Sequence, residues 1–100
     1  MSVHPSIQLN KAFENRVRLG IMSLLMVEEW VDFNSMKEML DITDGNLASH
    51  ASALEKAEYI MIRKSFIGKK PHTTYAATTL GKHEFKKHID ALEKLIKNRF

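Results

Sequence analysis

The segment Arg16–Val27 has the pattern of a helix with one apolar face. Its apolar residues recur at intervals of three and four, which is the spacing of one side of an α-helix. These residues are Val17, Ile21, Leu24 and Leu25. A chain of 100 residues that is 44% hydrophobic holds enough apolar material to bury this face in one compact core. We therefore predict that residues 1–100 form a single domain packed around a central helix.

Composition and motifs exclude several classes of protein. The chain has no cysteine, which excludes disulfides, zinc–thiolate sites and cysteine nucleophiles. No apolar run approaches the roughly 20 residues that span a bilayer, and residues 1–10 lack the charged-then-apolar order of a signal peptide. Neither a Gly-x-Ser-x-Gly nor a His-Glu-x-x-His motif is present. We expect a cytoplasmic protein that is not an enzyme and has no cofactor and no membrane contact.

Short elements are expected on either side of the central helix. Residues 7–13 are weakly amphipathic, and residues 30–33 form a brief β-prone run. Ser35 and Glu38 then fit a capping box ahead of a short helix that ends near Leu40. The connection to the next helix is tight.

A second strong helix is predicted over about residues 44–57, with Thr43 or Asp44 as its cap. Its apolar residues fall on one face at i, i+4 and i+7: Leu47, Ala51 and Leu54. The opposite face consists of glycine and mostly short polar side chains: Gly45, Ser49, Ser52 and Lys56, flanked by Asn46 and Ala53. A helix this slim fits the major groove of DNA, which is about 12 Å wide, and its N-terminus favours a phosphate.

Other readings of this helix stay open. A face of small residues can simply touch water or another helix. His50 lies near the edge of the buried face, where it is either a partly buried packing residue hydrogen-bonded to the backbone or a contact to a base or phosphate. We include Asp44 and His50 among the residues expected to contact DNA.

Residues 60–78 predict a β-hairpin with a basic tip formed by Gly68-Lys69-Lys70-Pro71. Residues 60–75 contain four basic residues and no acidic one, whereas residues 28–44 contain six acidic residues and one base. Long cations on a hairpin suit phosphate and minor-groove contacts. The expected contacts are Arg63, Lys64, Lys69, Lys70, His72 and Thr73.

A long terminal helix is predicted over about residues 79–98, with Thr79 as its cap. Its apolar residues have nearly coiled-coil spacing, which indicates contact with a second subunit or, alternatively, with the core of its own subunit. They are Phe85, Ile89, Leu92, Leu95 and Ile96.

Two groups of residues could form ligand sites, but each also fits an ordinary structural role. The terminal helix contains four possible metal ligands: His83, Glu84, His88 and Asp90. Of these, only Glu84 and His88 are spaced i, i+4, and two ligands fall short of a tetrahedral metal site. Ordinary surface histidines are therefore favoured over a metal site. Methionine adapts to varied shapes and could line a pocket for a small-molecule effector, although core packing is favoured. The methionines concerned are Met22, Met26, Met36 and Met39.

The order of these elements, together with three motifs, resembles winged helix-turn-helix transcriptional regulators of the MarR and ArsR families. The motifs are Asn15-Arg16-Val17-Arg18-Leu19-Gly20-Ile21-Met22, Thr43-Asp44-Gly45-Asn46-Leu47-Ala48-Ser49-His50 and Tyr75-Ala76-Ala77-Thr78-Thr79-Leu80-Gly81-Lys82. The sequence departs from the family pattern at Ala48 and Ala51, and at Glu58, which takes a helix-ending position usually held by glycine.

The resemblance implies a mainly α (α+β) winged-helix fold with a two-stranded β-hairpin wing and a long C-terminal dimerisation helix. It further implies a homodimer that binds double-stranded DNA sequence-specifically and regulates transcription as a repressor, with an unidentified small-molecule effector. The alternative is a winged-helix protein-interaction module that has lost DNA binding, in which the hairpin and the acidic segment 28–44 dock another protein.

Overall fold

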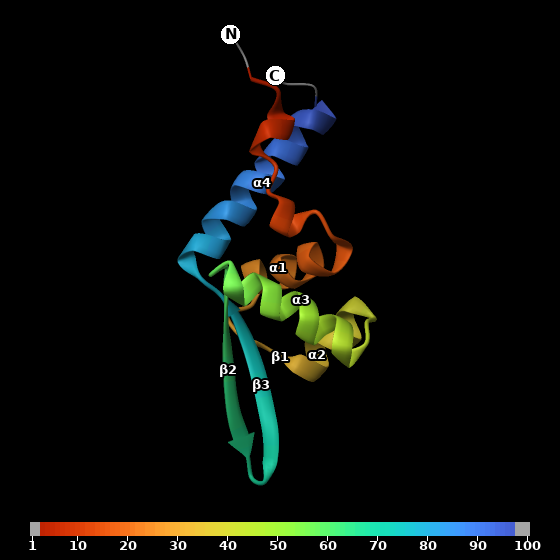
Figure 1. Ribbon diagram of the computed structural model, residues 1–100, viewed down its shortest axis with the longest axis vertical. Helices are drawn as coiled ribbons and strands as arrows, with labels where there is room; N and C mark the ends of the chain where they lie inside the picture. Colours follow the sequence, from red (N-terminus) through yellow and green to blue (C-terminus); the bar gives the residue numbers. More distant parts are fainter. Residues whose placement is uncertain (1–2, 98–100) are drawn as a thin grey trace.

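The structure is a computed structural model that describes residues 3–97 (Figure 1). It is a mainly helical winged-helix fold, as predicted. The molecule is elongated, with extents of 59 × 25 × 21 Å, and the hairpin projects from one end. In chain order the elements are η1 (Pro5–Gln8), η2 (Lys11–Phe13), α1 (Arg16–Val27), β1 (Val31–Asp32), α2 (Phe33–Leu40), α3 (Asp44–Lys56), β2 (Ile60–Ile67), β3 (Lys70–Ala77) and α4 (Thr79–Lys97).

Helix α1 is the centre of the core, and it has the predicted bounds. It begins at Arg16 because the Asn15 side chain accepts hydrogen bonds from the first free backbone N–H groups, those of Val17 and Arg18. Its buried residues pack against α2, α3 and β3, and each fully buried apolar side chain contributes roughly 1.5–3 kcal/mol. The largest fully buried side chains are Phe13, Ile21, Met22, Leu25, Met36, Leu47, Leu54 and Ile60.

The helix-turn-helix consists of α2 and α3. Asp32, not Ser35, caps α2: its carboxylate accepts from the Ser35 backbone N–H at 3.1 Å and from the Ser35 hydroxyl at 2.6 Å. The turn passes through Asp41 in the left-handed conformation (φ 52°), and Thr43 then caps α3 by accepting from the Asn46 N–H. The two helices are thus joined by only three residues, which fixes how α3 is presented.

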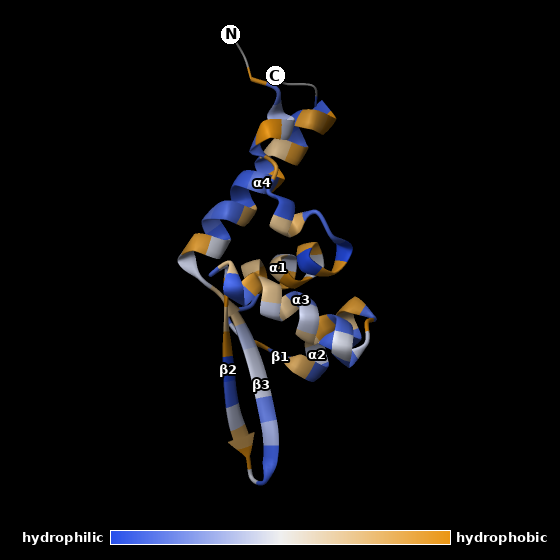
Figure 2. Ribbon diagram, viewed as in Figure 1, coloured by the Kyte–Doolittle hydropathy of each residue, from blue (hydrophilic) through white to orange (hydrophobic). Residues whose placement is uncertain are grey.

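The wing is the β2–β3 hairpin, and β3 also pairs with β1, so that three antiparallel strands lie in the order β1-β3-β2. Ile67 pairs with Lys70, which leaves a two-residue turn at Gly68 and Lys69. Only the first of these has a positive φ (64°), as in a type II′ turn, where glycine is favoured. Figure 2 shows the hydrophobic end of β2 beside the hydrophilic start of β3.

The junction between α3, the wing and α4 is closely packed. Glu58 follows α3 in the left-handed conformation (φ 66°), at the position where the sequence departs from the family's glycine. Thr78, not Thr79, caps α4: its hydroxyl accepts from the Gly81 N–H at 2.9 Å and donates to the Glu58 carbonyl at 2.7 Å. A Cβ at Gly81 would lie 1.9 Å from the Tyr59 carbonyl oxygen, so this approach requires glycine.

Helix α4 runs away from the wing, and η1 packs along it (Figure 1). The structure follows α4 to Lys97; residue 98, the expected end of the helix, lies outside the described residues. None of the helices within residues 3–97 combines the length and apolar character that crossing a membrane requires.

Candidate nucleic-acid interface

The outward face of α3 is arranged as its periodicity predicts. Leu47, Ala51 and Leu54 are buried against the core. The opposite side is exposed and carries no large side chain other than Lys56. Its exposed residues are Gly45, Asn46, Ser49, Ser52 and Lys56. A helix with this cross-section can approach a base edge closely, and Asn and Ser can exchange hydrogen bonds with one.

Two of the α3 residues expected to contact DNA have side-chain partners within the chain. The Asp44 carboxylate lies 2.8 Å from Lys37 Nζ on α2, an ion pair that offsets its negative charge near the start of α3. The Arg18 Nε–H donates to His50 Nδ1 at 3.1 Å, which ties α3 to α1. Burial, with the Arg18 charge adding, lowers the pKa of His50 below its ordinary value, so the ring is neutral and accepts this bond. The partner of the ring is thus the Arg18 side chain and not the backbone, and contact of His50 with DNA stays a prediction.

A groove of about 530 Å³ separates α3 from the wing, and we call it the α3–wing groove. It brings together predicted residues from both elements, namely Ser52 of α3 with Lys64 and Thr73 of the wing. Its remaining lining is Phe33, Ala48, Glu55, Ile62 and Tyr75. Burial raises the pKa of Tyr75 to about 12, so this phenol stays neutral.

Sequence reasoning missed Glu55 and the structural use of Ala48. Ala48 is exposed where bulkier residues are common in the family, and its small side chain keeps the α3–wing groove open. Glu55 sets a carboxylate among groups that otherwise suit a phosphate. The helical period puts Ala48, Ser52 and Glu55 on one stripe, but only the folded chain reveals that this stripe faces the wing.

Arg63 and His72 lie on the other face of the hairpin. Arg63 pairs with Thr74, and Thr74 pairs with Asp32, which places all three side chains on the sheet face away from Lys64. There the Arg63 guanidinium carbon lies 4.1 Å from the centre of the Trp30 ring, a cation–π contact. Sequence analysis gave Trp30 no role. Lys69 and Lys70 remain exposed at the tip.

The terminal helix divides its predicted apolar residues between two environments. Phe85 is buried in its own subunit, edge-on to Phe13 with ring centres 5.2 Å apart. Ile89 and Ile96 are exposed, and Leu92 and Leu95 are half-buried. The four residues other than Phe85 therefore offer apolar surface to another molecule.

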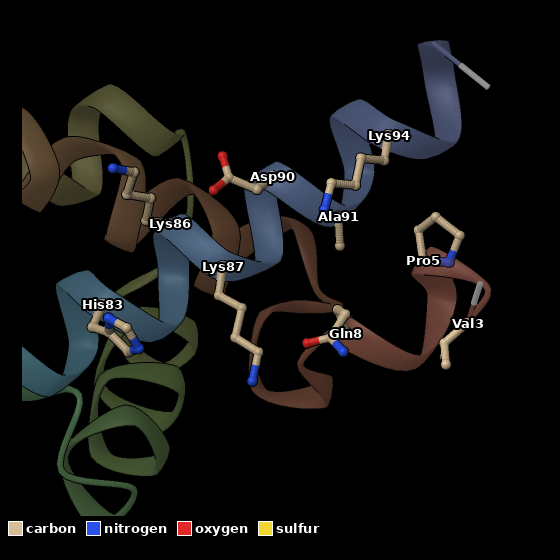
Figure 3. A pocket seen from close by; sticks show the side chains of 9 residues that line it. All are labelled: Val3, Pro5, Gln8, His83, Lys86, Lys87, Asp90, Ala91 and Lys94. Carbon is tan, nitrogen blue, oxygen red and sulfur yellow. The ribbon is translucent and has the colours of Figure 1, made fainter. Parts of the chain in front are cut away.

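A second hollow, of about 580 Å³, lies between η1 and α4, far from the wing. Figure 3 shows Lys87 and Gln8 reaching into the space between α4 and the N-terminal segment. Its charged lining is mainly basic, with Lys86, Lys87 and Lys94 against Asp90, and His83 also lines it. His88 does not line it; the ring is buried, and its Nδ1 accepts from the Asn10 backbone N–H at 2.9 Å.

The methionines do not line a common pocket. Met22 and Met36 are fully buried in the core, whereas Met26 and Met39 are exposed. Core packing therefore accounts for the first two.

Comparison with known proteins gives a consistent result. Residues 17–96 match the family described as winged helix DNA-binding domain. An uncharacterized protein of Methanocaldococcus jannaschii is 38% identical over 88 residues, which cover 88% of this chain and 96% of that protein. The fold is similar to that of a transcriptional regulator homologue from Pyrococcus horikoshii, with a TM-score of 0.84, 32% identity and coverage of 93% and 92%. It is also similar to the heme sensor protein PefR of Streptococcus agalactiae, with a TM-score of 0.75, 20% identity and coverage of 95% and 65%.

Proposed function

The chain belongs to the winged helix DNA-binding domain family, and from that premise we propose that it is a homodimeric regulator of transcription that binds double-stranded DNA sequence-specifically and represses. The predicted winged-helix family and fold are confirmed. In this proposal residues 1–100 act as one DNA-binding domain, and the protein works in the cytoplasm.

The observation that carries the proposal is the slim exposed face of α3 beside the basic wing. Helix α3 enters the major groove with the side that bears Ser49 and Ser52 toward base edges. The adjacent phosphate strand lies in the α3–wing groove, where Lys64 and Thr73 donate to it. The hairpin tip, with Lys69 and Lys70, reaches the next minor groove.

The residues proposed to contact DNA form two sets. On the recognition helix they are Asp44, Gly45, Asn46, Ser49, His50, Ser52 and Lys56, with Asp44 acting through its pair with Lys37. On the wing they are Arg63, Lys64, Lys69, Lys70, His72 and Thr73.

A dimer is needed because one winged helix contacts few base pairs. Two copies place their recognition helices in successive major grooves, about 34 Å apart. The exposed apolar residues of α4 supply the contact between subunits in this proposal. Repression follows from occupying an operator, and a small-molecule effector relieves it by changing the angle between the two recognition helices. The hollow between η1 and α4 is the candidate effector site because it adjoins the proposed dimer contact.

Sedimentation of the purified protein with a random-sequence duplex tests the proposal. We expect a dimer that binds the duplex at about 50 mM salt and releases it at about 200 mM, because released counterions drive phosphate binding. Changing Lys69 and Lys70 to alanine together should remove binding. The matched control changes Lys82 and Lys86, which are also exposed but lie on α4, away from the hairpin tip. A protein that ignores DNA at low salt, or a tip variant that still binds like the control, would refute the proposal.

A further inference from the structure

An exposed apolar surface lies where the end of α1 meets α2, and its apolar side chains line neither the α3–wing groove nor the proposed subunit contact. A hollow of about 370 Å³ is lined there by Leu24, Val27, Trp30 and Met39, which we call the Trp30 patch. Val27 is 83% exposed and Met39 is 55% exposed. Apolar side chains gathered around a hollow, unlike singly scattered ones, indicate a contact surface.

The Trp30 patch faces away from the candidate DNA interface. Met39 and Ser35, which also lines the hollow, lie on one side of α2, whereas Lys37 lies on the opposite side and pairs with Asp44 of α3. None of the residues proposed to contact DNA lines the hollow, and only Arg63 among them touches the patch, through the Trp30 ring. A partner at this patch therefore leaves α3 and the inner face of the wing free.

The surroundings of the Trp30 patch are acidic. Glu28 and Asp32 line the hollow, and Glu29 and Glu38 are exposed next to lining residues in the chain. The nearby base is Arg63, and its charge is held over the Trp30 ring. This local sign opposes the net charge of +3 of the whole chain. Phosphates of nucleic acid and anionic lipid headgroups are repelled here, whereas lysine and arginine side chains are attracted.

We propose that the Trp30 patch docks a cationic segment of a second protein that carries an apolar anchor, such as one face of an amphipathic helix. The anchor fills the hollow beside Trp30, and the basic residues of the segment meet Glu28 and Glu29 at its rim. This inference does not rest on DNA binding, so each can fail without the other.

Trp30 gives a direct readout because it is the only tryptophan in the chain. The probe is a synthetic peptide of about 14 leucine and lysine residues with leucine on one helical face. We expect its addition to shift Trp30 emission to shorter wavelength in a saturable manner, as the ring loses water. The same peptide with glutamate in place of lysine should produce no such shift.

Variants locate the binding. Changing Val27 and Met39 to serine together should weaken binding by about tenfold or more, because both anchoring contacts are lost. Changing Glu28 and Glu29 to glutamine should weaken it and reduce its salt dependence. The matched control is Phe66→Ser, an exposed apolar residue in basic surroundings at the wing tip, which should bind like the parent.

Three outcomes would overturn the inference. They are the absence of a saturable shift with the lysine peptide, equal binding of the glutamate peptide, and parental binding by the Val27 and Met39 variant. A Trp30 emission that changes with the concentration of the protein alone, and loses that dependence in the same variant, would instead assign the patch to a second copy of this chain.

Discussion

Gly81 tolerates substitution by a larger residue less well than the other glycines of the chain. Its Cα faces the Tyr59 carbonyl so closely that a methyl group would overlap backbone, which cannot move aside as a flexible side chain could. We predict that Gly81→Ala lowers the free energy of unfolding by about 1–3 kcal/mol, because α4 and the connection after α3 must separate. Denaturant unfolding measures the change.

Gly45 provides the control for this prediction. A Cβ there meets nothing within 4 Å, and the residue lies inside α3. Gly45→Ala should therefore leave stability unchanged or raise it by about 0.5 kcal/mol, since alanine loses less backbone entropy on folding. Equal destabilisation by both substitutions would show that the close approach at Gly81 is not the cause.

The residues that cap the helices were the least predictable from the sequence. Asp32 and Ser35 are both good capping residues three positions apart, and the sequence favoured the later one. The pairing of Asp32 with Thr74 decides between them, because strand β1 ends there and the helix starts at once. Which of Thr78 and Thr79 caps α4 likewise depends on the Glu58 carbonyl, a tertiary partner. Buried faces were predictable because helical periodicity is local.

Among the elements, one contact between the N-terminal segment and α4 is made by a buried histidine. His88 is 2% exposed, and burial lowers its pKa below the ordinary 6.5, with the Glu14 charge opposing the shift. Only the neutral ring can accept the Asn10 N–H at Nδ1. Asn10 in turn donates a hydrogen bond from its side-chain amide to the Tyr59 hydroxyl at 3.0 Å, so this segment connects both to α4 and to the link between α3 and β2.

The pH dependence of stability follows from this contact. The pKa of His88 is lower in the folded chain than in the unfolded chain, so as the pH falls the unfolded chain takes up the proton first. The stability due to a neutral His88 is therefore fully present above pH 6.5 and is lost as the pH falls below that value. We expect a lower free energy of unfolding at about pH 5.5 than at about pH 7.5, and a smaller difference in His88→Gln. The pKa of His50 is also lowered, so this residue contributes to the pH dependence with the same sign, and His50→Gln measures its share for comparison with that of His88. A His88→Gln profile as steep as the parent's would contradict this account.

Glu55 of α3 faces the wing across the α3–wing groove, so its effect on DNA affinity can be tested. Its carboxylate lines the groove proposed for a phosphate strand. We predict that Glu55→Gln raises affinity for duplex DNA by about twofold to fivefold at low salt, because one repulsion is removed. Fluorescence anisotropy with a labelled duplex measures it. Glu38→Gln, an equal charge change on α2 outside the groove, should have a smaller effect; equal gains would reveal only a general charge effect.

The existence and order of the elements were predictable, but contacts between them were not. Period-two alternation puts Ile62 and Lys64 on one face of β2 without stating that this face turns toward α3. Phe85 belongs to the apolar repeat of α4, yet Phe13 from η2 covers it. Which elements face each other depends on contacts between segments far apart in the chain, and the periodicity of one segment carries no information about them.

For the whole molecule, the wing and α4 occupy opposite ends of a body 59 Å long. In the proposed dimer, contact at the α4 end sets the spacing of the recognition helices. Ile96 is 84% exposed on that helix, two turns beyond Ile89. We predict that Ile96→Glu leaves unfolding nearly unchanged and yields monomers in sedimentation, because burying a carboxylate between subunits is costly.

The loss of the dimer should also appear in DNA binding. If each subunit neutralises about two to four phosphates, the parent dimer gives a slope of about −4 to −7 in a plot of log affinity against log salt, and a monomer gives about half of it. Val27→Glu is the matched control, because Val27 is equally exposed but lies at the end of α1. It should keep the dimer and the full slope. An Ile96→Glu protein that stays dimeric would show that the subunit contact lies elsewhere than at this end of α4. A monomer with an undiminished salt slope would show that the phosphate contacts of one subunit do not depend on the other.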